Sequence, residues 1–260
     1  MNYTKYLYPI IPLLGFFLCW EIAARFDLIN TGLFPSPVTI LHDLKELFYQ
    51  ETSGRSILLT HLAITLKRLF YASIEGTLVG FIVGICIGLS SRFYRFCDPI
   101  ITVIMPIPGI AMAPLFIVWL GFGDATIITA GAVAAFFPIA HNTSIGVRSI
   151  DRQLVRAAQI MGANRISVLS QVYIPWSAVY LFTGIKLGLA RCWRTVIAVE
   201  FIAAANWGLG YMIWDAAEYL NASVVYGGII LLAITFTVIE RGLISFLEHA
   251  TIVKWGMIRS

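Results

Sequence analysis

Residues 99–120 read PIITVIMPIPGIAMAPLFIVWL, an apolar stretch long enough to cross a lipid bilayer, which takes about 20 such residues. Three prolines interrupt it, at Pro106, Pro108 and Pro114. Because each proline removes a backbone donor and clashes with the preceding helical turn, the stretch cannot form one straight helix. Broken helices are tolerated at membrane depth only beside protein or a water-filled cavity, and they commonly mark transport pathways. The stretch therefore predicts either a broken span that lines a pathway or a kinked helix that only packs.

The remainder of the chain has the same membrane character. Of its 260 residues, 59% are hydrophobic and 12% are charged, whereas an average soluble domain is about 45–50% apolar and about 25% charged. This composition excludes a disordered chain, a disulfide-stapled secreted domain and an ordinary soluble enzyme. The basic stripe that a nucleic-acid binder would carry is not visible in the sequence either.

Six stretches are long and apolar enough to span a bilayer: residues 6–24, 69–89, 99–120, 126–147, 176–201 and 224–246. A cleaved signal peptide is the alternative for the first stretch, but Glu21 closes it and no clear small-x-small cleavage site precedes a soluble domain. We therefore expect an all-α integral membrane protein with six transmembrane helices, organised as one domain over residues 1–260.

Lys and Arg residues in the loops fall mainly on one side of these six spans. Since positively charged loops stay in the cytoplasm, we expect both termini and the loop of about residues 147–175 on that side. The segment of about residues 31–60 is then external. It contains a predicted amphipathic helix, whose apolar face carries Ile40, Leu41, Leu44, Leu47 and Phe48.

The second span carries four glycines at a spacing of four residues: Gly76, Gly80, Gly84 and Gly88. Small residues let helix backbones approach closely, and packing drives helix association in lipid. The pattern favours packing within the chain over a dimer seam. Glu75 begins the run and is expected to face protein or water rather than lipid.

The fifth span contains four ionisable residues: Lys186, Arg191, Arg194 and Glu200. At 100° per residue Arg191 and Arg194 share one helix face. A charge at mid-bilayer costs at least about 2.5–3.5 kcal/mol on insertion scales, so three cations need partners or water. They therefore indicate either a positively lined path that attracts an anion or ion pairs to Glu75, Glu200 or Glu240.

The loop between the fourth and fifth spans reads GVRSIDRQLVRAAQIMGANRISVLSQVYIP over residues 146–175. Asp151 is placed to cap a helix over residues 152–160, and Gly162 ends that helix. A second helix is predicted from Arg165. A short helix–Gly–helix unit that projects from the membrane is typical of a docking element.

With its spacing, this loop resembles the coupling-helix signature of ATP-binding-cassette (ABC) importer permeases. That pattern has an Ala-Ala pair, then Gly after three residues, then an Ile-x-Leu-Pro-like end roughly a dozen residues later. The family usually has Glu before the Ala pair, where this chain has Arg156. The resemblance implies that the ATPase-coupling residues are Arg156, Ala157, Ala158, Gly162, Ala163, Ile174 and Pro175.

Further segments resemble the nitrate, sulfonate and bicarbonate branch of the same family, and taurine or aliphatic sulfonate permeases above all. They include Leu33-Phe34-Pro35-Ser36-Pro37, Pro106-Ile107-Pro108, Trp119-Leu120-Gly121-Phe122-Gly123 and Glu200-Phe201-Ile202-Ala203-Ala204. The resemblance implies a type I ABC importer permease fold in a bacterial inner membrane. It also implies a second permease chain (a homodimer), two ATPases that bind ATP and Mg²⁺, and an external solute-binding protein.

The expected solute is a small anion: a sulfonate such as taurine, nitrate or bicarbonate. A pyrimidine precursor is the alternative within the same class. The substrate path is expected to involve Pro106, Pro108, Lys186, Arg191, Arg194 and Glu200.

Other classes fit less well. The sequence has no G-x-x-x-x-G-K-[ST] loop, so ATP hydrolysis is expected on a separate chain, with no cofactor on this one. A stand-alone secondary transporter would need its own coupling-ion site and usually internal repeats, and neither is visible. A membrane enzyme would need a catalytic constellation, whereas the four histidines are scattered without metal-ligand spacing.

Overall fold

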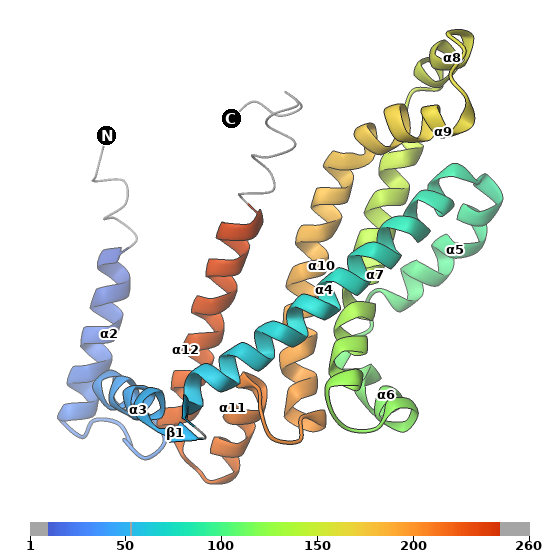
Figure 1. The fold of residues 1–260 in the computed structure, drawn as a ribbon. Helices are drawn as coiled ribbons and strands as arrows, with labels where there is room; N and C mark the ends of the chain where they lie inside the picture. The colour runs from blue at the N-terminus through green and yellow to red at the C-terminus, as the bar shows by residue number, and fades with distance from the viewer. Residues whose placement is uncertain (1–9, 53, 245–260) are drawn as a thin grey trace. The chain divides into compact units, whose positions relative to one another are not determined.

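The computed structural model describes residues 10–52 and 54–244. Over these ranges the chain is almost entirely helical, apart from loops and one short hairpin (Figure 1). In chain order the elements are α2 (Ile10–Arg25), α3 (Pro37–Tyr49), β1 (Glu51–Thr52), β2 (Arg55–Ser56), α4 (Ile57–Leu89), α5 (Ser91–Ile104), η1 (Gly109–Met112), α6 (Ala113–Leu120), α7 (Asp124–Arg148), α8 (Arg152–Ile160), α9 (Arg165–Val168), η2 (Leu169–Tyr173), α10 (Ile174–Ala203), α11 (Leu209–Glu218), α12 (Ala222–Ile239) and η3 (Glu240–Ile244). The predicted all-α class is confirmed.

Within the described residues, four helical runs are long and apolar enough to cross a membrane: Ile57–Leu89, Asp124–Arg148, Arg165–Ala203 and Ala222–Gly242. A bent helix pair raises this number to five if the pair forms one span. The predicted first span, 6–24, begins outside the described residues. Its described part, α2, has 16 residues, fewer than the about 20 that a span needs. The six-helix count therefore stays a prediction.

The predicted break in the third span is confirmed. Helix α5 ends at Ile104, and after the Pro106–Pro108 turn the chain continues as η1 and α6, bent by 99° from α5. Pro114 plays a different part from the other two prolines, because it lies in the first turn of α6. A proline there lacks only an N–H that has no helical partner anyway, so it helps to start the helix.

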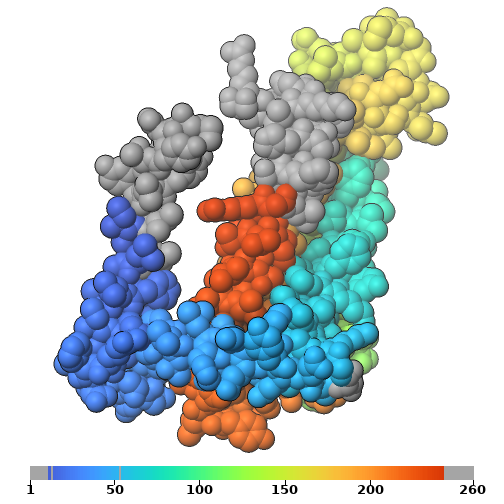
Figure 2. All heavy atoms as spheres, turned by 60° about the vertical axis from the view of Figure 1, so that its left-hand side comes forward, coloured from blue at the N-terminus to red at the C-terminus, as the bar shows by residue number. Residues whose placement is uncertain are grey.

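The chain divides into two compact units. One contains α2, α3, the start of α4, α11 and most of α12, and the other contains the rest of α4 and the elements α5 to α10. In the first unit the predicted amphipathic helix is present as α3, which Ser36 caps through its side chain. Figure 2 shows the light-blue segment that contains α3 lying on the orange part of the same unit. There Asp43 of α3 accepts a hydrogen bond from Ser223 of α12, and Leu44 of α3 packs on Gly227 of α12.

In the second unit, the glycine run of the second span packs α4 directly on α7. A Cβ built at Gly76, Gly80, Gly84 or Gly88 would lie 2.5–3.0 Å from atoms of α7. A Cβ at Gly184 or Gly188 of α10 would also meet atoms of α7, at 3.1 and 2.9 Å. The predicted role of the glycines in packing within the chain is confirmed, and α4, α7 and α10 pack against one another, since Ser73 of α4 also contacts Cys192 of α10.

Candidate functional site

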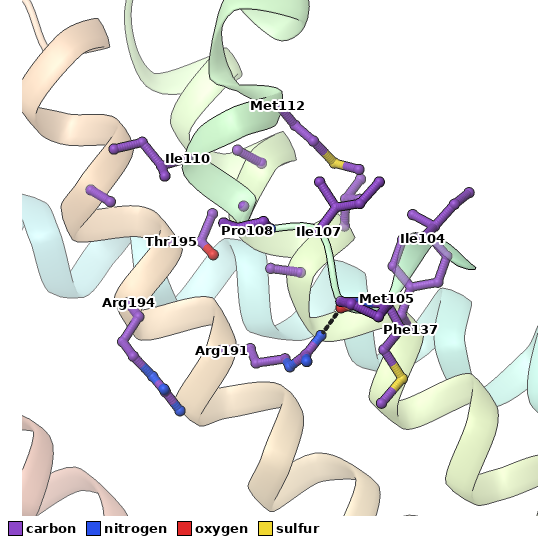
Figure 3. A pocket seen from close by; sticks show the side chains of 16 residues that line it. Ile104, Met105, Ile107, Pro108, Ile110, Met112, Phe137, Arg191, Arg194 and Thr195 are labelled. Carbon is purple, nitrogen blue, oxygen red and sulfur yellow. Dashed lines mark hydrogen bonds between the residues drawn. The ribbon is translucent and has the colours of Figure 1, made fainter. Parts of the chain in front are cut away.

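A cavity of about 320 Å³ lies where the third span breaks (Figure 3). The turn between α5 and η1 forms one wall, and α7 and α10 form the others. Of the predicted path residues, Pro106, Pro108, Arg191 and Arg194 line this cavity together, while Lys186 and Glu200 are not among its lining residues. The other lining side chains are mostly apolar: Ile104, Met105, Ile107, Ile110, Met112, Ala130, Val133, Ala134, Phe137, Thr195 and Ala198.

Arg191 satisfies a backbone group that the break sets free. Its Nη1 donates to the carbonyl oxygen of Met105, the residue that follows the last turn of α5, at 2.6 Å. The last carbonyls of a helix have no partner within it. Leaving such a group buried without a hydrogen bond costs about 1–3 kcal/mol. The arginine therefore stabilises the break as well as lining the cavity.

Arg194 lies three residues further along α10 and is exposed. Its Nε donates to the carbonyl oxygen of Ala190 on the same helix at 3.0 Å. In Figure 3 its side chain extends along α10, away from the Met105 carbonyl. The positive charge of Arg194 thus lies beside a cavity whose other lining side chains are mainly apolar.

A second contact fixes the break to α10 and was not predicted. Gly109, the first residue of η1, lies so close to Thr195 that no side chain would fit between them. Thr195 is one helical turn beyond Arg191, so both contacts come from the same face of α10. The glycine after Pro-Ile-Pro is a sequence signal for a close approach, but nothing in the sequence identifies its partner.

The carboxylate of Glu200 belongs to a separate buried cluster. Arg68 of α4 donates through Nη1 to Glu200 Oε1 at 2.7 Å, and Thr65 Oγ1 lies 3.0 Å from both carboxylate oxygens. Arg68 also reaches Asp124, the first residue of α7, through Nη2 at 2.7 Å. Glu200 has no exposed area and Arg68 is 4% exposed. The cluster thus ties α4, α7 and α10 together at one end of the unit.

The ion pairs proposed as the alternative for the fifth-span cations do not form within the described part of the chain. There, no carboxylate lies within 4.0 Å of a side-chain nitrogen of Lys186, Arg191 or Arg194. Lys186 is exposed on α10. The alternative in which Glu200 pairs with one of these three cations is not seen in the described residues, where Arg68 of α4 pairs with Glu200 instead.

The α8–α9 loop folds as its sequence predicts. Asp151 caps α8 by accepting a hydrogen bond from the backbone N–H of Gln153 at 2.8 Å. After α8, Gly162 adopts a left-handed conformation with φ of +87°, and the N–H of Ala163 bonds to the carbonyl of Ala158 at 3.0 Å. This is a Schellman motif, in which glycine is favoured because it takes positive φ without strain. The spacing between the Ala pair and Gly162 thus has a backbone explanation.

The tip of this loop is exposed, and its base is held by a contact that was not predicted. Ile160 is 87% exposed and Met161 is 81% exposed. Arg156, Ala157 and Gly162 are also exposed, whereas Ala158, Ala163, Ile174 and Pro175 are half-buried. At the base, Trp176 Nε1 donates to Ser149 Oγ at 3.1 Å, which joins the start of α10 to the end of α7. Large apolar side chains exposed together typically mark a contact surface.

The described histidines lie in different surroundings. His61 is buried and its Nδ1 lies 2.8 Å from the carbonyl oxygen of Gly208, which fits a structural role. His42 is exposed on α3, where its ligand atom lies within 4.8 Å of those of Asp43 and Glu46. His141 lines a smaller cavity beside Arg191. His249 lies outside the described residues.

Broken spans beside a cavity commonly mark transport pathways in membrane proteins, and here the same bundle also carries an exposed helical loop. The family model described as "Binding-protein-dependent transport system inner membrane component" matches residues 76–247, and the chain belongs to this family. It is a permease subunit of an ABC importer, an inner-membrane component that spans the membrane several times, and not the ATPase.

Curated relatives match along most of the chain. The chain is 36% identical to the taurine transport system permease protein TauC of Escherichia coli, over 86% of this chain and 81% of the relative. It is 30% identical to the putative aliphatic sulfonates transport permease protein SsuC of Bacillus subtilis, over 91% and 83%. It is 25% identical to the nitrate import permease protein NrtB of Synechocystis, over 95% and 90%.

A solved structure shows the same fold. A chain in the inward-facing MetNI methionine ABC transporter superposes with a TM-score of 0.63 at 23% sequence identity. The match covers 78% of this chain and 96% of that one. The similarity shows that the chain has the importer permease fold.

The role of Glu200 can be tested by replacing it with glutamine. Glu200→Gln keeps the shape of the side chain but leaves Arg68 without its buried counter-charge. Breaking a buried ion pair in this way lowers the free energy of unfolding by about 3–5 kcal/mol. We expect a lower thermal midpoint of the purified protein, measured by fluorescence-detected size exclusion after heating. Asp124→Asn is the matched control and should cost less, because Asp124 is 44% exposed. A normal midpoint with lost transport in Glu200→Gln would instead indicate a path residue.

Proposed function

We propose that this permease carries a small solute of the sulfonate class, such as taurine, which is a zwitterion, or an anionic aliphatic sulfonate. The relatives named for taurine, aliphatic sulfonates and nitrate support this class, since all three names refer to small solutes with an oxyanion group. The observation that carries the proposal is the pair of arginines in the wall of the mainly apolar cavity at the broken span. Arginine presents several N–H donors in a planar fork that fits such oxyanions.

The proposed arrangement in the membrane follows the charge distribution of the loops. Both termini and the α8–α9 loop lie in the cytoplasm, and the segment around α3 faces outward. An external binding protein delivers the solute on that side. A second copy of the permease completes the assembly, with ATP and Mg²⁺ bound by two ATPase chains.

Coupling to ATP hydrolysis is proposed to run through α8. The exposed tip of the loop, around Ile160 and Met161, sits in a groove on the ATPase. From there, residues Arg165–Ala203 form one helical run that reaches both Arg191 and the break in the third span. A movement of the ATPases is thereby passed to the cavity, and access switches from one side of the membrane to the other. Such coupling needs two global states that ATP and solute bias differently.

Uptake of labelled taurine tests the proposed solute. Cells that make this chain with its ATPase and binding-protein partners should accumulate taurine against a gradient, and other sulfonates should compete. Omitting the ATPase should abolish accumulation, because this chain cannot hydrolyse ATP. ATP-dependent uptake of nitrate or of a pyrimidine, without taurine uptake, would agree with an ABC importer permease but refute the proposal that its solute is a sulfonate. Equal uptake by this chain alone would contradict its role as a subunit.

Photo-crosslinking tests the proposed coupling surface. A photoreactive amino acid at Ile160 should crosslink to the ATPase in membranes, because its side chain projects from the tip of the loop. The matched control is Phe122, which is 71% exposed but precedes the opposite end of α7. It should give no ATPase product. Crosslinking of the ATPase from Phe122 and not from Ile160 would reverse the proposed orientation of the permease.

A further inference from the structure

Arg191 lies in the walls of two cavities. Besides the cavity of about 320 Å³ at the break, a second one of about 340 Å³ is lined by Ile101, Thr102, Met105, Pro106, His141 and Arg191. The two cavities have Met105, Pro106 and Arg191 in common. The α7 residues that line the first cavity lie between positions 130 and 137, whereas the α7 residue that lines the second cavity is His141. The second cavity is therefore nearer to the end of α7 that leads to α8.

The residues common to both cavities include the two partners of the hydrogen bond from Arg191 Nη1 to the Met105 carbonyl, at 2.6 Å. In a continuous helix that carbonyl would accept from the N–H four residues later. Here that residue is Gly109, which begins η1 after the bend. The position of the Met105 carbonyl therefore depends on a side chain from α10. Because the donor is charged and its surroundings are mainly apolar, the bond is strong while it is formed.

The two arginines differ in what their guanidinium groups do. Arg191 is half-buried and uses its terminal nitrogen on the broken span. Arg194 is exposed, and its one hydrogen bond within the described part of the chain runs from Nε to its own helix. Its terminal nitrogens make no hydrogen bond within the described part of the chain, whereas a terminal nitrogen of Arg191 is already engaged with the backbone (Figure 3).

We propose that the Arg191–Met105 contact is the partition between two successive compartments of the pathway, and that Arg194 is the residue that binds the negative charge of the solute. The proposal rests on the proposed function, because it takes the cavity at the break as part of the pathway. Arg191 is a positioning residue that acts through the broken span. When α10 moves relative to α5, the contact opens and the two cavities join into one passage toward the α8 end.

Hydrogen exchange tests the partition without any assumption about the solute. The assembled importer, with wild-type permease or with Arg191→Gln, Arg191→Lys, Arg194→Gln or Arg194→Lys, is placed in lipid nanodiscs. Exchange is measured over residues 105–113. We expect several-fold faster exchange in Arg191→Gln, because the break loses its anchor. Arg191→Lys should exchange at a rate between the two, since an ammonium group can still donate to the carbonyl. Both Arg194 variants should match the wild type.

Uptake into proteoliposomes tests the division of roles. Arg191→Gln should reduce uptake of zwitterionic taurine and of anionic ethanesulfonate by the same factor, because a loosened break affects every solute. Arg194→Gln should reduce ethanesulfonate uptake several-fold more than taurine uptake. Arg194→Lys, which keeps the positive charge, should retain most of the wild-type ethanesulfonate uptake. Exchange over residues 152–160 serves as the control for an intact fold and should be unchanged in all variants.

Two results would overturn the proposal. One is wild-type exchange over residues 105–113 in Arg191→Gln together with an uptake defect that grows with the charge of the solute, which would make Arg191 the anion-binding residue. The other is the same graded defect in both glutamine variants, which would remove any division between the arginines. A wild-type importer that carries no sulfonate would refute the solute class, while the exchange measurement would still decide whether the partition exists.

Discussion

Backbone polar groups at membrane depth need partners inside the protein, because lipid offers none. In the third span the helix α5 ends before the prolines, so backbone groups at the break lose their helical partners. Other residues of the second unit replace those partners. Arg191 bonds to the Met105 carbonyl, and Gly109 lies against Thr195 one helical turn away. Because both anchors come from α10, the break and this helix are held together. The cavity, its charge and its place beside the proposed pathway all follow from that arrangement.

The break can be held only because the surrounding helices are closely packed and fixed. Glycines of α4 and α10 bring both helices close to the backbone of α7. At one end of the bundle, Arg68 joins Glu200 to Asp124. At the other end, Trp176 bonds to Ser149 at the base of the exposed loop. A rigid helix between an exposed loop and a cavity is what a permease needs if ATP hydrolysis on another chain is to change access to its pathway.

Sequence alone identified the features that depend on residues close together in the chain. The three prolines predicted the break, the glycine spacing predicted close helix packing, and Asp151 with Gly162 predicted the ends of α8. The sequence did not identify contacts between distant segments: Arg68 with Glu200, Gly109 with Thr195, or Ser149 with Trp176. Helical periodicity gives the face on which a residue lies but not the helix that faces it. For the same reason, Arg191 and Arg194 looked equivalent in the sequence although their surroundings differ.

The central claim is that the broken span encloses the pathway of an anion. Its most direct test is the reactivity of Ala198→Cys, which lines the cavity, in an importer whose native cysteines are replaced by alanine. We predict that a sulfonate-bearing thiol reagent modifies this cysteine faster than a cationic one does, and that the side of access changes when ATP is bound. Val79→Cys, on the exposed face of α4 and outside the cavity lining, is the control. Equal rates for the two reagents, or no modification in either nucleotide state, would contradict the account.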